Sequence, residues 1–153
     1  MKSLSQLFAV ILAAFVFAAC NSTHNAKAAN PGSSNAPASL TGTEWVLRDL
    51  AGTPALDAPR ATLQFLEGGH VAGNGSCNRF TGSVEISGAS LKFGPLASTR
   101  MACTNGGVGD QEDRYLRALG AATRYALENG DLLIYSDAAT EPLRFARVAE
   151  PKS

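Results

Sequence analysis

The sequence predicts a sheet-rich α+β domain with one main helix. Fifteen glycines and seven prolines among 153 residues indicate many turns, a composition that favours strands over a helical bundle. Short apolar alternations recur between these turns from Leu40 onward, whereas residues 109–122 space their apolar side chains at helical intervals. The chain length suits one domain of roughly 100–150 residues plus targeting material.

The strands are predicted in order along the chain. TEWVLRDL places Trp45 and Leu47 on one face and polar side chains on the other, and ATLQFLEGGHVAG does the same with Leu63 and Phe65 before turning at residues 67–69. An Asn-Gly pair at 129–130 lies between two apolar runs, which indicates a hairpin. The remaining predicted strands are SVEIS, SLKFG and the closing PLRFARV.

The helix is predicted between residues 109 and 122. Asp110 is expected to cap it, and the acidic residues that follow favour the positive end of the helix dipole. Gly120 is expected to end it. The polar positions after the cap are Gln111, Glu112 and Asp113, and the apolar stripe expected to pack on the sheet comprises Tyr115, Leu116, Leu119 and Ala122.

The N-terminus predicts export and lipidation. Residues 1–19 have a basic start and a core of about 13 apolar residues, too short to span a bilayer but suited to a signal peptide. The sequence from Phe17 to Cys20 resembles the bacterial lipobox, in which the cysteine is acylated, for example with palmitate, and becomes the new N-terminus. Ordinary cleavage nearby, which would release a soluble protein, is the alternative.

Three regions are therefore expected: a signal peptide at 1–19, a lipidated cysteine and flexible linker at 20–39, and a folded domain at 40–149. The linker is rich in Asn, Ala, Ser and Pro and lacks large apolar side chains, so it cannot form a core. Asn21 follows the cysteine where an aspartate would resemble an inner-membrane retention signal. We expect an outer-membrane anchor with the domain facing the periplasm.

The charge balance limits the expected partners. Lys and Arg number 13, and Asp and Glu also number 13. A formal net charge of zero gives no electrostatic reason to expect nucleic acid as a partner. The expected partners are the membrane, through the lipid on Cys20, and an unknown envelope protein or small molecule.

Cys77 and Cys103 are expected to form a disulfide, because a pair of cysteines in an exported domain is kept oxidised. Closing a loop of about 26 residues would stabilise the fold by roughly 3 kcal/mol. A thiol nucleophile would need a base, and the domain offers His70 alone; a zinc site would need four ligands. These two alternatives are less favoured, and no cofactor or metal is expected.

Two motifs carry a family resemblance: GSCNRFTG at residues 75–82 and LASTRMAC at 96–103, followed by Glu112 at the helix start. In this order they resemble the META domain of HslJ-like heat-shock lipoproteins. The resemblance covers the whole folded domain and implies a curved antiparallel, partly barrel-like sheet with one main helix packed on it. It also implies a link to heat shock and novobiocin tolerance, and it supplies no agreed catalytic residues.

The motif residues have two interpretations. Arg79 and Arg100 could bind an anion together with the hydroxyls of Ser98 and Thr99. Alternatively, one of the arginines pairs with Glu112 and fixes the two cysteine-bearing segments to the helix, which is the favoured interpretation.

Three further motif residues are expected to be structural. Asn78 suits a turn or a left-handed backbone position and can bond to nearby backbone through its amide. Phe80 and Met101 are expected in the core beneath the disulfide.

The function expected from the sequence is that of a non-catalytic envelope lipoprotein that serves as a binding or stress-tolerance module. One alternative is a small periplasmic hydrolase that uses Glu112 and Asp113 as acid and base. Another is a chaperone-like module that binds extended peptides along a sheet edge.

Overall fold

A computed structural model describes residues 39–104 and 106–149. The predicted signal peptide, the predicted lipidation site at Cys20 and most of the predicted linker lie outside these residues. Nine antiparallel strands and one α-helix are present in the described part. The elements are β1 (Thr43–Leu50), β2 (Ala61–Phe65), the 3-10 turn η1 (Glu67–Gly69), β3 (His70–Gly75), β4 (Arg79–Ser87), β5 (Ser90–Phe93), β6 (Ala97–Ser98), α1 (Val108–Gly120), β7 (Ala122–Glu128), β8 (Asp131–Ser136) and β9 (Leu143–Arg147).

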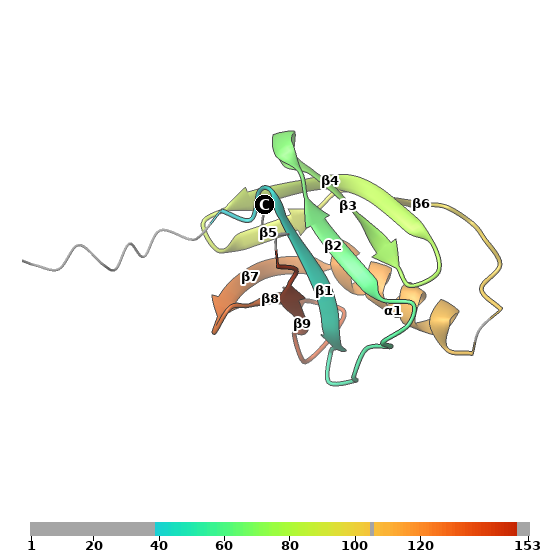
Figure 1. Cartoon of the computed structure of the whole chain (residues 1–153). Coiled ribbons are helices and arrows are strands. Elements are labelled where there is room, and N and C mark those ends of the chain that lie inside the picture. The colour runs from blue at the N-terminus through green and yellow to red at the C-terminus, as the bar shows by residue number, and fades with distance from the viewer. Residues whose placement is uncertain (1–38, 105, 150–153) are drawn as a thin grey trace, which may run out of the picture. The chain divides into compact units, whose positions relative to one another are not determined.

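Eight of the strands form a closed up-and-down barrel (Figure 1). β1 to β5 pair in sequence, β7 to β9 do the same, β5 meets β7 at Ser90 and Arg124, and β9 returns to pair with β1. β6 follows β5 along the same edge of β4. The α+β class is therefore confirmed, and the sheet is a complete barrel where the sequence led us to expect a partial one.

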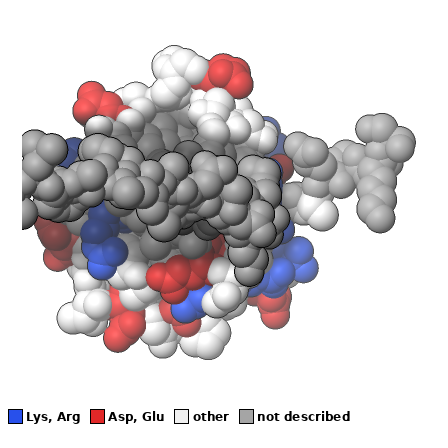
Figure 2. All heavy atoms as spheres, turned by 90° about the vertical axis from the view of Figure 1, so that its left-hand side faces the viewer, with Lys and Arg blue, Asp and Glu red and all other residues white. Residues whose placement is uncertain are grey.

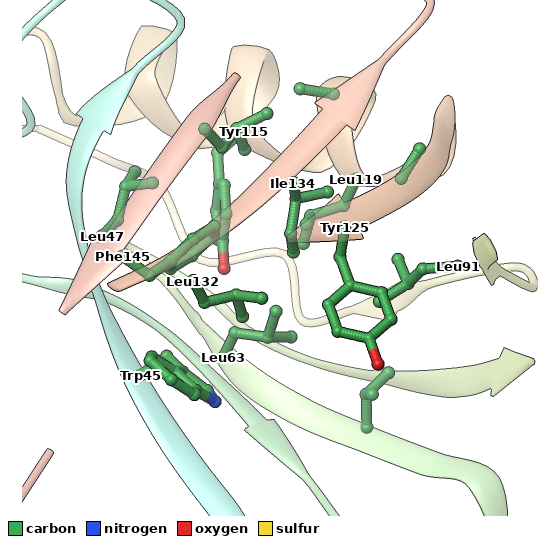
Figure 3. Packing of buried hydrophobic residues seen from close by; sticks show 14 of the residues in the cluster. Trp45, Leu47, Leu63, Leu91, Tyr115, Leu119, Tyr125, Leu132, Ile134 and Phe145 are labelled. Carbon is green, nitrogen blue, oxygen red and sulfur yellow. The ribbon is translucent and has the colours of Figure 1, made fainter. Parts of the chain in front are cut away.

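The barrel interior is filled by the side chains that the alternation placed on one face. Trp45 and Leu47 of β1 and Leu63 and Phe65 of β2 are all buried, as predicted. The 129–130 turn has both residues at positive φ, as a tight hairpin of this kind requires. Figure 3 shows how the buried side chains from opposite walls meet, and their burial is the main stabilising term of the fold.

Helix α1 lies across one end of the barrel. It contacts β3, β5 and β8, which are not neighbours in the barrel, so it must cross the opening rather than cover one wall (Figure 1). Tyr115 projects inward from the helix, and its ring lies 5.9 Å from that of Phe80 and 6.1 Å from that of Phe145. Its hydroxyl donates to the carbonyl of Thr62 at 3.1 Å. The helix is thereby fixed to the two walls that it joins.

The helix boundaries correct two predictions. The N-cap is Gly107, at φ 80°, without a side-chain cap, so Asp110 lies inside the first turn and does not cap the helix. Ala122 is the first residue of β7 and is not part of the helical stripe. The helix buries Ala118 in addition to Tyr115 and Leu119. The end of the helix at Gly120 is confirmed. A glycine in a left-handed conformation is the N-cap, three residues before Asp110, and the usual preference for capping side chains does not indicate it.

Charged side chains of both signs are mixed on the part of the surface that is visible in Figure 2. This view faces the left-hand side of Figure 1. The mixture agrees with the balanced charge of the sequence and provides no field of a single sign there.

The buried phenol of Tyr115 predicts a loss of stability in alkali. Burial raises the pKa of the Tyr115 hydroxyl well above its ordinary value near 10. The unfolded chain loses this proton at about pH 10 while the folded chain keeps it, so stability is retained below that pH and falls above it. We expect Tyr115→Phe to cost about 1 kcal/mol at neutral pH and to reduce the alkaline loss.

The measurement is the urea midpoint of the purified protein at several pH values between about 7 and 11. Tyr135→Phe is the matched control, because Tyr135 lies on the barrel surface beneath the guanidinium of Arg124. An alkaline loss that is the same in Tyr115→Phe and in the unaltered protein would contradict the prediction.

Candidate functional site

A disulfide joins the two motifs at the helix-bearing end of the barrel. Cys77 lies in the turn between β3 and β4, and Cys103 precedes α1. Their sulfurs are bonded at 2.10 Å, with the Cα atoms 5.9 Å apart. The pairing predicted from the sequence is therefore present, and in this form neither sulfur is a free thiol.

Glu112 is the central acceptor of the site. Its Oε2 atom accepts hydrogen bonds from the backbone N–H groups of Cys77, at 3.1 Å, and Asn78, at 2.5 Å. Its Oε1 atom accepts from Nδ2 of Asn78 at 2.8 Å. Because the carboxylate is 7% exposed, these donors replace the water that it loses. The carboxylate holds the β3–β4 turn against the helix.

Asn78 links Glu112 to the second motif. Its Oδ1 atom accepts from the N–H of Met101 at 2.7 Å and from the hydroxyl of Thr99 at 2.9 Å. Glu112 and the 99–101 segment therefore lie on opposite sides of one buried carboxamide. Asn78 lies in the turn and bonds to backbone through its carboxamide, as expected, and the residue of this turn at positive φ is Ser76, at φ 99°.

A second polar link was not anticipated from the sequence. Gln111 donates from Nε2 to the hydroxyl of Ser76 at 2.5 Å, and its Oε1 accepts from the N–H of Leu56 at 2.8 Å. Gln111 and Ser76 are both buried. No sequence signal indicates this contact, because Leu56 belongs to an irregular loop 55 residues away.

The expected pairing of an arginine with Glu112 is corrected by the structure. Arg79 and Arg100 are both exposed, and neither pairs with Glu112; within residues 39–104 and 106–149 the ion pair found is Arg144–Asp131. The donors to Glu112 are amides, which satisfy the hydrogen-bonding capacity of a buried carboxylate without the cost of burying a second charge. The hydroxyls proposed for an anion are also engaged, since that of Ser98 donates to the carbonyl of Thr99.

Met101 is a further correction. Its side chain is 62% exposed, whereas Phe80 is buried as predicted. Met101 lies beside an open groove of about 850 Å³ between the segment 96–103 and helix α1. Arg100 and Thr99 also line this groove, and Asn78 and Glu112 contribute to it.

Gly75 lets the turn approach the helix closely. A Cβ atom built at this position would lie 2.6 Å from Oε2 of Glu112. We expect Gly75→Ala to displace the carboxylate and to lower the free energy of unfolding by about 1–3 kcal/mol.

Gly120→Ala is the control for this substitution, because its added methyl group would meet nothing within 4 Å. Alanine in a helix should be neutral or stabilising by up to about 1 kcal/mol. Thermal unfolding followed by circular dichroism compares the two variants. Equal melting temperatures would refute the close approach at Gly75.

The described residues also bear on metal binding and on membranes. No group of three or more His, Cys, Asp and Glu side chains there is arranged to hold a metal ion. In the same part of the chain, no helix has the length and apolar character needed to cross a membrane.

The fold and the site together define a small up-and-down barrel with a helix across one end, whose two motif loops are joined by a disulfide and by a buried carboxylate. The family model of the META domain matches residues 38–150. The chain therefore belongs to the META domain family.

Two solved structures are similar to this chain. A protein from Burkholderia xenovorans, determined by NMR, is 30% identical, with a TM-score of 0.60 over 72% of this chain and 85% of that one. A second protein determined by NMR is 26% identical, with a TM-score of 0.58 over 70% of this chain and 90% of that one. No curated protein matches the chain.

Proposed function

We propose that the protein is a non-catalytic lipoprotein of the cell envelope that presents its META domain as a binding module. The observation that carries this proposal is the groove beside residues 96–103. The polar side chains of Asn78 and Glu112 next to it form hydrogen bonds within the fold. Both oxygens of Glu112 accept hydrogen bonds from the turn that they hold. A recess next to a rigid hydrogen-bonded frame suits binding, since the frame loses little conformational entropy when a partner enters.

The anchor proposed at Cys20 fits the position of the groove. β1 begins beside the end of β2, where Thr43 pairs with Phe65 (Figure 1). The groove is lined by residues at the opposite end of the barrel, among them Asn78, which precedes β4. A tether that precedes β1 would therefore join the domain at the end opposite the groove. The family resemblance extends the proposal to survival of heat and novobiocin.

A periplasmic hydrolase is the competing function. It would need Glu112 or Asp113 to exchange protons with a substrate. The hydrogen bonds of Glu112 to the turn weigh against that role, and Asp113 is an exposed residue on the helix. Substrate turnover that disappears in Glu112→Gln, while the variant stays folded, would favour the hydrolase and refute our proposal.

Lipidation and sorting are tested in the bacterium that encodes the protein. We expect the unaltered protein to incorporate a labelled fatty acid and to fractionate with the outer membrane, because two or three acyl chains make anchoring effectively permanent. Cys20→Ser should lose the label. Asn21→Asp is the matched variant, and it should keep the label but move to the inner membrane.

The same strains test the function. A deletion strain carrying the unaltered gene should survive heat and novobiocin better than the deletion strain alone, and the Cys20→Ser gene should not restore survival. Full restoration by Cys20→Ser would show that the anchor is not required. Equal survival with and without the unaltered gene would contradict the stress-tolerance role.

A further inference from the structure

The segment that begins with β6 uses only one of its two backbone edges. The N–H of Thr99 donates to the carbonyl of Arg79 at 3.0 Å, so Ser98 and its partner Phe80 form a non-hydrogen-bonded pair of the antiparallel ladder. Two residues further on, the N–H of Met101 donates to Oδ1 of Asn78. Successive residues of an extended chain point their backbone groups to opposite edges, so those of Ser98 and Arg100 face away from β4.

This outer edge is open in the described part of the chain. No residue within 39–104 or 106–149 forms a hydrogen bond with the backbone N–H or C=O of Ser98 or Arg100. Both residues are exposed. An open strand edge of this kind can accept another strand.

Asn78 extends the edge beyond the end of regular pairing. The Oδ1 atom of its side chain accepts a hydrogen bond from the N–H of Met101, which a backbone carbonyl would accept if the regular ladder continued. The Nδ2 atom of the same side chain donates to Glu112, which fixes the carboxamide in place. β6 itself covers Ala97–Ser98, and the bonds of Thr99 and Met101 hold the next three residues to the β4 side before any partner arrives. Such order reduces the entropy that a partner must overcome on binding.

The opposite wall of the groove is one face of α1. It presents residues at i, i+3, i+4 and i+7, which are Gly109, Glu112, Asp113 and Leu116. Leu96 and Leu116 are partly buried apolar side chains that line the groove, and the volume of about 850 Å³ is within the range of ligand sites. A groove between a free strand edge and a helix is suited to peptides that add to a sheet as an extra strand.

We propose that this groove binds an extended polypeptide segment, which pairs with the backbone of Ser98 and Arg100 and places an apolar side chain over Leu96 and Leu116. This inference rests on the proposed binding function and names its ligand class. Because recognition is mainly through the main chain, sequence preference should be weak. The walls carry one exposed charge of each sign, Arg100 and Asp113, so a neutral segment is favoured.

The favoured occupant is a segment of another protein of the envelope. The chain's own linker, residues 20–39, offers no large apolar side chain to place over the two leucines. A second copy of the chain could pair edge to edge through the same residues, and the experiment separates these cases.

The test uses the full-length protein purified in detergent and a fluorescein-labelled, eight-residue peptide of alternating valine and threonine with a terminal lysine. We expect saturable binding in fluorescence polarisation and slower hydrogen exchange at residues 98–100. A peptide of the same sequence that is N-methylated at alternate residues should bind at least about tenfold more weakly, because it cannot complete the ladder.

Ser98→Pro and Ser98→Ala form the matched pair of variants. Proline removes the outward N–H while tolerating an edge position, so the fold should persist and binding should fall by at least about tenfold. Alanine keeps the N–H and should bind like the unaltered protein. Equal binding by both variants, or by the N-methylated peptide, overturns edge pairing while leaving the wider binding function intact.

Three other outcomes also overturn the inference. In the first, the protein binds no peptide up to about 1 mM but still restores survival in the deletion strain. That result would leave the proposed function standing. Another is a concentration-dependent dimer that is lost in Ser98→Pro, which would assign the edge to a second copy. The third is peptide binding that appears only after residues 21–37 are deleted, which would assign the groove to the linker.

Discussion

Replacement of Glu112 by alanine is expected to lower the free energy of unfolding by about 3–5 kcal/mol. The substitution removes the acceptor of three hydrogen bonds, from the N–H groups of Cys77 and Asn78 and from the Asn78 side chain. A buried donor without a partner costs about 1–3 kcal/mol, and the loss of the side-chain volume adds to that cost. Urea denaturation followed by circular dichroism measures the change.

Two further variants separate the hydrogen bonds from the charge and from general effects of substitution. Glu112→Gln keeps one oxygen for the backbone N–H groups but turns an NH₂ group toward Nδ2 of Asn78, so we expect an intermediate loss. Asp113→Ala changes an exposed neighbour on the same helix and should lie within about 0.5 kcal/mol of the unaltered protein. If Glu112→Ala unfolds at the same urea concentration as Asp113→Ala, the carboxylate does not hold the turn.

Removal of the disulfide is expected to lower the free energy of unfolding by about 3 kcal/mol. The bond closes a loop between residues 26 apart in the sequence and restricts the unfolded chain more than the folded one. The variant is the double substitution Cys77→Ser and Cys103→Ser, compared with the unaltered protein in urea. Hydrogen exchange should also become faster along residues 96–104, whose attachment to the turn then depends on Asn78.

Alkylation followed by peptide mapping checks the bond directly. Without reductant, the peptides that contain Cys77 and Cys103 should carry no label, and both should be labelled after reduction. Labelling of both without reductant would mean that the thiols are free. The effects of the disulfide and of Glu112 should not be additive, because both act on the backbone of Cys77 and Asn78.

These contacts give one explanation for the two sequence motifs of the chain, CNRF and TRMAC. The disulfide, Asn78 and Glu112 tie the two segments to each other and to the helix. The tie holds residues 97–101 beside the groove that they form with the helix. In this arrangement the polar residues of the motifs build the site, and the backbone that they hold is the surface that we propose for a partner.

The sequence by itself determined the local elements of this protein. Side-chain alternation placed Trp45 and Leu63 on the buried faces of their strands, the Asn-Gly pair at 129–130 located a hairpin, and Gly120 ended the helix. Each of these features depends on residues close together in the chain, where periodicity and turn chemistry act directly. The cysteine pair was predictable too, because the choice of partner was limited to two residues.

Only the tertiary structure decided the closure of the barrel and the partners of the polar side chains. Closure depends on β9 pairing with β1, about 100 residues away, and alternation cannot select a partner at that distance. Glu112 proved to bond amides of the β3–β4 turn, and Met101 proved to be exposed, because the turn and the 99–101 segment meet the helix at the barrel end. A carboxylate accepts equally from an arginine or from a backbone N–H, so its partner is set by the three-dimensional position of the segments and not by residue type.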